Sequence, residues 1–253
     1  MERITSVQNN KIKETAALSD TRKRKKSGFF VAEGRKLVEE LIRCNIRPVR
    51  CFIKEGTPLP PGLEECETYC VTDAVMKKIS TLSTPQDIIA VAKQPERSDG
   101  GDEDIIIALD ALQDPLNLGA ILRSAEAFGV KTVVLGQGCC DAYSTKTLRG
   151  AMGSVFRLNV IEKDLVGYVK CMKEKGYDII GTGLDKNFRT VDKLMLSEKK
   201  VVIIGNEGNG ISETVKNACD FGMFIPMSGE NESLNAAVAA SIIMWENKRQ
   251  SNG

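Results

Sequence analysis

Apolar and polar positions alternate in long blocks over the second half of the chain. Short runs rich in Ile, Val, Leu and Phe predict buried strands at residues 104–112, 131–136, 177–184, 199–204 and 221–227. Periodic apolar positions between and after them predict helices at residues 117–129, 163–176, 211–220 and 233–248. Strands alternating with helices predict an α/β fold with a parallel sheet covered on both faces. Ligands of such sheets bind beyond the carboxyl ends of the strands, so the loops there are the candidate site.

The first half of the chain predicts a smaller α/β domain. Its apolar pattern indicates strands near residue 30 and at 49–54, 65–71 and 88–93, with helices at 9–18, 34–44 and 73–80. The stretch "KQPERSDGGDED" is polar, contains Pro and Gly, and is typical of a linker. We therefore predict an N-terminal domain at 1–95, a linker at 96–103 and a C-terminal domain at 104–253.

Composition removes several classes of chemistry. The 253 residues include 0 histidines, which excludes Ser-His-Asp and Cys-His nucleophile systems and His-ligated catalytic metals. The 8 cysteines follow no metal-ligand spacing, so no metal is expected. No apolar run reaches the roughly 18–20 residues of a membrane span, and the first residues lack the apolar segment of a signal peptide. A cytoplasmic protein without a membrane partner is the expectation.

The net charge of +1 is spread unevenly. Residues 1–98 hold 18 Lys and Arg against 13 Asp and Glu, and the densest basic run is "TRKRKK" at 21–26. This run fits a solvated loop or a phosphate-binding patch equally well, because clustered cations bind nucleic acid by releasing counterions. The candidates for RNA binding are Arg22, Lys23, Arg24, Lys25, Lys26 and Arg35.

The first loop with candidate chemistry leads into "NLGAILRSAEAFG". Asn117 is a plausible N-cap for a helix that begins at Leu118. At 100° per residue, one face of this helix carries the apolar residues Leu118, Ile121, Leu122, Ala125 and Phe128. Arg123 points nearly opposite, which is usual for a solvated arginine and also for one that faces a ligand.

Two further loops follow later strands. "IIGNEGNGIS" contains Gly205, Gly208 and Gly210 but matches neither a P-loop nor a dinucleotide-binding fingerprint, and Glu207 stands among its glycines. In "GENESLNAAVAASIIMWENK", Ser233 is a good N-cap for a helix that starts at Leu234. A helix needs one cap, so Asn235 in the predicted first turn is left over.

These three stretches, in order and spacing, resemble the three motifs of the SpoU-type (TrmH-like) RNA ribose 2′-O-methyltransferases of the SPOUT superfamily. The resemblance covers about residues 104–248. Through "FFVAEGRKLVEEL" and "STLSTPQDIIAVAK", the first half resembles the ribosomal-protein-like RNA-binding domain of that family.

The resemblance implies transfer of a methyl group from S-adenosylmethionine to a ribose 2′-hydroxyl of RNA. It also implies a deep trefoil knot in the C-terminal domain and a homodimer with residues of both subunits near each cofactor. The residues implied for catalysis are Arg123, Asn117, Glu207, Ser233 and Asn235. Those implied for the cofactor are Thr182, Gly205, Asn206, Ile225, Met227, Leu234 and Asn235. No role is assigned to Glu232.

The arginine of this family is described as a general base, but a guanidinium keeps its proton in almost any protein setting. We therefore favour a role in which Arg123 holds RNA phosphate and stabilises developing alkoxide charge. Ribosomal RNA is expected because the two-part layout resembles the ribosomal members. The alternatives are a tRNA ribose methyltransferase and a catalytically silent RNA-binding relative. A nucleotide-dependent enzyme with a Rossmann sheet is disfavoured because the fingerprint is absent.

Overall fold

The apolar runs of the second half form a parallel sheet in the computed structural model, which describes residues 1–185, 188–228 and 233–251. Within those residues the sheet has seven strands, all parallel, in the order β10-β12-β9-β11-β6-β7-β8. The strands are β6 (Ile105–Leu109), β7 (Thr132–Leu135), β8 (Asn159–Glu162), β9 (Asp178–Thr182), β10 (Arg189–Thr190), β11 (Lys200–Ile204) and β12 (Phe221–Phe224). The α/β class is confirmed, as are the five predicted strands, which are β6, β7, β9, β11 and β12; β8 and β10 were not predicted.

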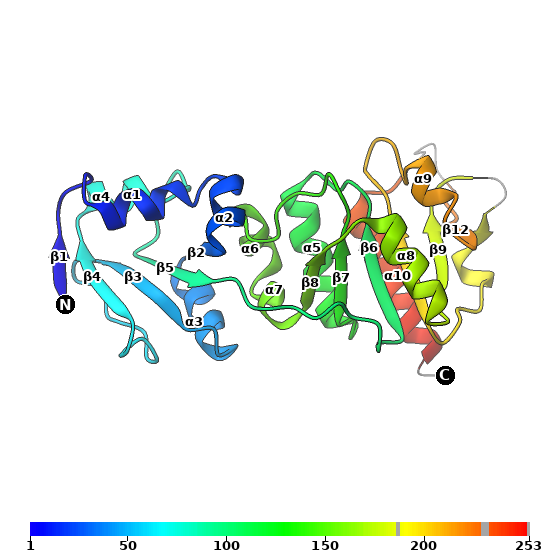
Figure 1. Ribbon diagram of the computed structural model, residues 1–253, viewed down its shortest axis with the longest axis horizontal. Coiled ribbons are helices and arrows are strands. Elements are labelled where there is room, and N and C mark those ends of the chain that lie inside the picture. Colours follow the sequence, from blue (N-terminus) through cyan, green and yellow to red (C-terminus); the bar gives the residue numbers. More distant parts are fainter. Residues whose placement is uncertain (186–187, 229–232, 252–253) are drawn as a thin grey trace. The chain divides into compact units, whose positions relative to one another are not determined.

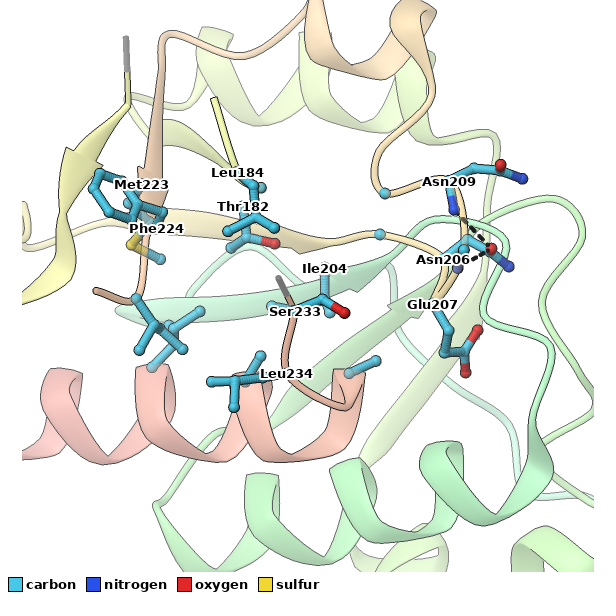
Figure 2. Close-up of a pocket in the computed structure, with 18 of the residues that line it drawn as sticks. Thr182, Leu184, Ile204, Asn206, Glu207, Asn209, Met223, Phe224, Ser233 and Leu234 are labelled. Carbon is cyan, nitrogen blue, oxygen red and sulfur yellow. Dashed lines mark hydrogen bonds between the residues drawn. The ribbon is translucent and has the colours of Figure 1, made fainter. Parts of the chain in front are cut away.

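Helices cover both faces of this sheet. The helices are α5 (Pro115–Ala127), α8 (Leu165–Glu174), α9 (Glu213–Lys216) and α10 (Ala236–Ser251), with a 3₁₀ turn at Val191–Lys193. Val169 of α8 and Val215 of α9 pack in one core with alternate strand residues such as Ile106 and Ile203. On the opposite face α5 and α10 lie side by side (Figure 2). The hydroxyls of Ser124 on α5 and Ser241 on α10 are 2.7 Å apart. A sheet buried on both faces explains why its strands are continuous apolar runs.

A smaller mixed sheet forms in the first half. Its order is β1-β4-β3-β5-β2 in the described part of the chain, and β5 pairs antiparallel with its two neighbours. The strands are β1 (Glu2–Ile4), β2 (Phe29–Glu33), β3 (Pro48–Lys54), β4 (Glu67–Val71) and β5 (Ile88–Lys93). The helices are α1 (Asn10–Ala17), α2 (Thr21–Ser27), α3 (Arg35–Arg43) and α4 (Asp73–Ile79), and α1 and α4 pack together over one face (Figure 1).

Contacts divide the chain into two compact units whose membership is not continuous in sequence. One unit comprises Met1–Glu96 and Asp141–Phe156, and the other comprises Arg97–Cys140 and Arg157–Gly253. The segment at 141–156 holds α6 (Thr145–Ala151) and most of α7 (Ser154–Arg157). The boundaries at 95 and 104 drawn from composition do not anticipate that this later segment joins the N-terminal unit.

Candidate functional site

A cavity of about 440 Å³ lies at the carboxyl ends of β9, β11 and β12. This volume is within the range of small-molecule sites, and the position is the one expected for a ligand of a parallel sheet. Figure 2 shows the strand ends, the loop after β11 and the stretch that enters α10 around it. The residues that line the cavity are 182–184, 204–210, 223–225, 227, 233–234, Ala236, Ala239 and Ile243.

The loop after β11 requires glycine where it bounds the cavity. A Cβ added to Gly205 would overlap the backbone of Gly210 and Ile211. Asn206 and Gly210 exchange both backbone hydrogen bonds at 2.9 Å, which closes the loop into a tight turn. A side chain at position 205 would therefore push the turn open, and its absence brings backbone groups to the edge of the cavity.

The side chain of Asn206 is used inside this loop. Its Nδ2 donates to the carbonyl of Ala111 at 2.8 Å, and its Oδ1 accepts from the backbone N–H of Gly208 at 2.9 Å and of Asn209 at 3.3 Å. The amide thus fixes the loop against the segment after β6. Asn206 lines the cavity, but its side-chain amide and its backbone N–H both make hydrogen bonds within the protein.

Asp110, which the sequence did not single out, holds the far end of the same loop. Its Oδ2 accepts from both the backbone N–H and the hydroxyl of Ser212 at 2.7 Å, and the residue is buried. An acid directly after an apolar strand run is the sequence signal that identifies such a position. The loop after β11 is therefore held at both ends by Asp110 and Ala111, the two residues that directly follow β6.

Three predicted residues, from α5, from the loop after β11 and from the start of α10, form one hydrogen-bonded relay. Asn235 Oδ1 accepts from the backbone N–H of Ala237 at 2.9 Å and of Val238 at 3.3 Å, which leaves its Nδ2 to donate to Asn117 Oδ1 at 2.9 Å. Asn117 Nδ2 then donates to Glu207 Oε1 at 2.8 Å. Because an amide has one donating and one accepting end, each orientation fixes the next, from the start of α10 to the carboxylate of Glu207.

Both helix caps predicted for this region were wrong. Helix α10 begins at Ala236, and Asn235 rather than Ser233 is its N-cap, since the Asn235 side chain accepts from the first-turn amides. Helix α5 begins at Pro115, and its N-cap is Asp114, which accepts from the backbone N–H of Leu116 at 2.9 Å. Asn117 is therefore inside the first turn of α5 and 9% exposed, where its side chain is free to join the relay.

The other predicted cofactor residues meet at the cavity. Thr182, Gly205, Ile225, Met227 and Leu234 all line it, as Asn206 does, whereas Asn235 does not. The hydroxyl of Thr182 donates to the carbonyl of Ile203 at 2.9 Å, so it ties β9 to β11. Of the predicted catalytic residues, Glu207 and Ser233 line the cavity and Asn117 lies behind Glu207 in the relay.

Arg123 lies on the exposed side of α5, as its position opposite the apolar face predicted. It does not line the cavity, and within the described residues no hydrogen bond or ion pair engages its guanidinium. Its charge is thus available to a ligand that approaches from solvent. Glu232 lies outside the described residues.

Several apolar lining residues were missed. Leu184, Phe224, Ala239 and Ile243 line the cavity but were assigned no role. Their signal in the sequence is position alone, since the first two end or follow strands and the others lie on the first turns of α10. An apolar wall opposite backbone donors suits a ligand with both a ring system and charged ends.

The basic run at 21–26 folds as the helix α2, with Asp20 as N-cap and Gly28 as a left-handed C-cap at φ 71°. Arg22, Lys23, Lys25 and Lys26 are exposed. Arg24 is 4% exposed, and its guanidinium donates to Asp141 Oδ2 at 2.8 Å and to the carbonyls of Leu18 and Ser19. Its prediction as an RNA-binding residue is therefore corrected, because its donors are consumed inside the protein.

Arg35, the remaining basic candidate, is partly buried at the start of α3. Its guanidinium donates to the carbonyl of Pro58 at 2.7 Å and lies 3.9 Å from Glu39. Because these contacts engage part of the Arg35 guanidinium, fewer of its N–H donors remain for an RNA phosphate.

No metal site is found in the part of the chain that the structure describes, where no three His, Cys, Asp or Glu side chains gather. Burial raises the pKa of the Cys51 thiol to about 12, and that of Cys66 and Cys219 to about 11. Thiols with such pKa values are poor ligands and poor nucleophiles near neutral pH. Among the described helices, none is long and apolar enough to cross a bilayer.

Comparison with known proteins matches both halves of the chain. Residues 104–245 match the model of the SpoU rRNA Methylase family, and residues 9–90 match that of the MRM3-like substrate binding domain. The 23S rRNA (guanosine(2553)-2′-O)-methyltransferase RlmP of Bacillus subtilis is 35% identical over 246 residues, which is 97% of this chain and 98% of that protein.

Solved structures agree with these matches. A TrmH-family protein from Porphyromonas gingivalis superposes with a TM-score of 0.85 and 30% identity, over 97% of this chain and 99% of that chain. The AdoMet-bound rRNA methyltransferase of Sinorhizobium meliloti superposes with a TM-score of 0.86 and 25% identity, over 98% and 97%. The similarity extends over the full length of the chain rather than over one unit.

Proposed function

Because the chain belongs to the SpoU rRNA methylase family, we propose that it transfers a methyl group from S-adenosylmethionine to a ribose 2′-hydroxyl in ribosomal RNA. The observation that carries this proposal is the relay of Asn117, Glu207 and Asn235, which joins the three motifs at the edge of one cavity. The chain contains 0 histidines, so no imidazole acts as a general base. The enzyme's task is to align the two reactants and to stabilise charge on the attacking oxygen.

The cavity suits S-adenosylmethionine as cofactor. The turn at Gly205, into which no Cβ fits, brings backbone donors and acceptors to one side, and Ile225, Leu234 and Ile243 supply apolar surface. Such a lining holds an adenine ring by apolar contact and satisfies polar groups through the backbone. The bound cofactor supplies an electrophilic methyl group on a positively charged sulfur.

The side chains around the cavity have separable roles in this proposal. Arg123 holds an RNA phosphate and stabilises negative charge as it develops on the ribose oxygen, since its guanidinium is exposed and a guanidinium is a cation with donors that match phosphate. Asn117 and Asn235 position the Glu207 carboxylate at the cavity. Ser233 offers a hydroxyl at the cavity wall.

RNA binding is assigned to the N-terminal residues 1–95, and methyl transfer to residues 104–253, with 96–103 as the connection. The match of residues 9–90 to a substrate binding domain supports this division. Arg22, Lys23, Lys25 and Lys26 are exposed on α2 and are proposed to contact the RNA backbone. Ribosomal rather than transfer RNA is favoured by the similarity to RlmP.

The homodimer, the trefoil knot and the cytoplasmic location are carried over from the family. Exposed apolar side chains on α5 and α10 support a dimer that uses these helices: Leu116 is 60% exposed, Val238 47% and Trp245 52%. Large exposed apolar side chains on two adjacent helices are typical of a surface that a second subunit covers. In a dimer of this kind, Arg123 on α5 would lie near the subunit boundary.

The proposed function is tested by incubating the purified protein with methyl-labelled S-adenosylmethionine and unmodified RNA. Ribosomal RNA and transfer RNA are transcribed in vitro, reacted separately, and digested to nucleosides for mass spectrometry. Label in a 2′-O-methylated nucleoside from ribosomal RNA is the expected result. Label on a base would reject the ribose 2′-hydroxyl as the methyl acceptor, and label only in transfer RNA would reject ribosomal RNA as the substrate. No transfer to either RNA would reject the methyltransferase activity.

A further inference from the structure

Residues 141–156 lie between β7 and β8 in sequence but pack within the N-terminal unit. The ring of Phe30 on β2 lies 4.9 Å from that of Tyr143 and 5.7 Å from that of Phe156, measured between centroids. Helices α6 and α2 both pack against β2. These contacts place the two short helices next to the same strand.

A buried ion pair joins the two helices more directly. Arg24 of α2 and Asp141, which precedes α6, are 2.8 Å apart, with side chains only 5% and 7% exposed. Arg24 also donates to the carbonyls of Leu18 and Ser19, so its guanidinium is held on several sides. Breaking such a pair is costly, so α2 and the start of α6 keep one arrangement.

Both helices carry exposed cations without matching acids. Helix α6 adds Lys146 and Arg149, and neither helix contains an acidic residue. Asp20 and Asp141, the nearest acids in sequence, are occupied by the Lys23 amide and by Arg24. Across the described residues, no hydrogen bond or ion pair engages the charged groups of Arg22, Lys23, Lys26, Lys146 or Arg149, all of which are exposed.

Elsewhere in the N-terminal unit many basic side chains are neutralised within the protein. Arg3 pairs with Glu55, Arg47 with Glu65, Arg50 with Glu14, and Lys54 with Asp73. Cations left unpaired and gathered on adjacent helices are the electrostatic footprint of a polyanion site.

We propose that α2 and α6 form one phosphate-binding surface for the substrate RNA, in which Lys146 and Arg149 contact the ribose-phosphate backbone together with Arg22, Lys23 and Lys26. Arg24 and Asp141 are positioning residues that hold the two helices in register. The proposal rests on the proposed function, because it takes RNA as the polyanion. It assigns RNA contacts to a segment outside the residues 1–95 to which binding was first ascribed.

The test compares two double variants with the same change in charge. Lys146→Glu with Arg149→Glu alters the proposed surface, and Lys77→Glu with Lys78→Glu alters exposed lysines on α4. Affinity for in vitro transcribed ribosomal RNA is measured by fluorescence anisotropy between about 0.05 and 0.2 M salt. The α6 variant should bind about tenfold more weakly, with a salt slope lower by roughly 1 for each lost contact, and the α4 variant should stay within about twofold of wild type.

Equal weakening by the two variants would show an effect of net charge alone and overturn the proposal, as would unchanged affinity in the α6 variant or no RNA binding by the wild type. Lys146→Gln with Arg149→Gln, which removes charge without reversing it, should show a smaller change in the same direction. Affinity for S-adenosylmethionine should be unchanged in all three variants. Failure of the wild type to methylate bound RNA would reject the proposed function while leaving the comparison of affinities intact.

Discussion

Asn235 has two structural roles that substitution can separate. Its Oδ1 caps α10 by accepting from Ala237 and Val238, and its Nδ2 orients Asn117 toward Glu207. Asn235→Ala removes both roles. Asn235→Asp keeps a cap of equal quality, because Asp and Asn are similar N-caps, but leaves no donor for Asn117 Oδ1.

The two variants should therefore differ in stability and agree in activity. Loss of the cap costs about 1 kcal/mol, and an unsatisfied oxygen on the nearly buried Asn117 costs roughly 1–3 kcal/mol. Asn235→Ala should thus lose roughly 2–4 kcal/mol of unfolding free energy, and Asn235→Asp about 1 kcal/mol less. In both, Asn117 is free to rotate and Glu207 loses its fixed donor, so single-turnover methyl transfer should fall by at least about tenfold, equivalent to 1.4 kcal/mol.

Urea unfolding gives the stabilities, and single-turnover transfer to ribosomal RNA gives the rates. Asp164→Ala is the matched control, since Asp164 caps α8 by accepting from Gly167 at 2.8 Å and does not line the cavity. It should lose about 1 kcal/mol with an unchanged rate per folded molecule. Wild-type activity in Asn235→Asp would refute the positioning role of the relay, and equal stability of the Asp and Ala variants would refute the cap.

Four other outcomes are expected. Arg123→Ala should lower transfer roughly 10²–10³-fold while calorimetry shows affinity for S-adenosylmethionine within a few-fold, because Arg123 does not line the cavity; normal turnover would contradict its role. Gly205→Ala should abolish the thermal shift that S-adenosylmethionine produces, since a Cβ there overlaps the loop backbone, and a wild-type shift would show that the loop is not part of the cofactor site. Ser233→Ala should change unfolding free energy by less than about 0.5 kcal/mol because Ser233 is not the cap, whereas transfer should slow; a loss near 1 kcal/mol would restore it as cap. Hydrogen bonds from Arg249 lower the pKa of Glu246 below its ordinary 4.5. The ionised Glu246 carboxylate therefore stabilises the fold above pH 4.5, and this stabilisation is lost as the pH falls through the lowered pKa. Glu246→Gln should flatten this part of the pH dependence of the unfolding free energy, and an unchanged profile would reject a stabilising Glu246–Arg249 pair.

The large sheet was predictable because its main strands are buried on both faces. Strands such as "IIIAL" at 105–109 are apolar at every position because helices cover each side of the sheet, and that pattern is local. Strand β8 has only four residues, two of them polar, and β10 has two residues. These two segments are strands because β8 pairs with β7 and β10 pairs with β12, and no local sequence pattern predicts that pairing.

The sequence predicted most of the residues at the site but not which residue caps each helix there. Glu207 and Asn235 were singled out because they exceeded what a turn or a cap needs, Asn117 was a candidate N-cap, and the family resemblance implied a role for all three. Which residue caps each helix was misassigned, because Ser, Asn and Asp are nearly equal N-caps and the choice depends on tertiary contacts. For α5, Pro115 was an unused signal, since proline favours the first helical position and places the cap at Asp114.

The sequence does not show that residues 141–156 belong to the N-terminal unit. It depends on contacts such as Arg24 with Asp141, which are 117 positions apart. Within "TRKRKK", periodicity over a single short helix does not distinguish a buried arginine from its solvated neighbours. Only the position of the partner segment shows that Arg24 is structural while Lys23 and Lys26 remain exposed.

The most direct test of the central claim is a map of ribose methylation in ribosomal RNA from cells with and without the gene. Resistance of the backbone to alkaline cleavage reports each 2′-O-methyl group by its position. The expected result is one or a few protected positions that vanish on deletion and return with the wild-type gene but not with Arg123→Ala. Identical ribosomal RNA profiles in all these cells, or a lost signal confined to transfer RNA, would contradict methylation of ribosomal RNA by this protein.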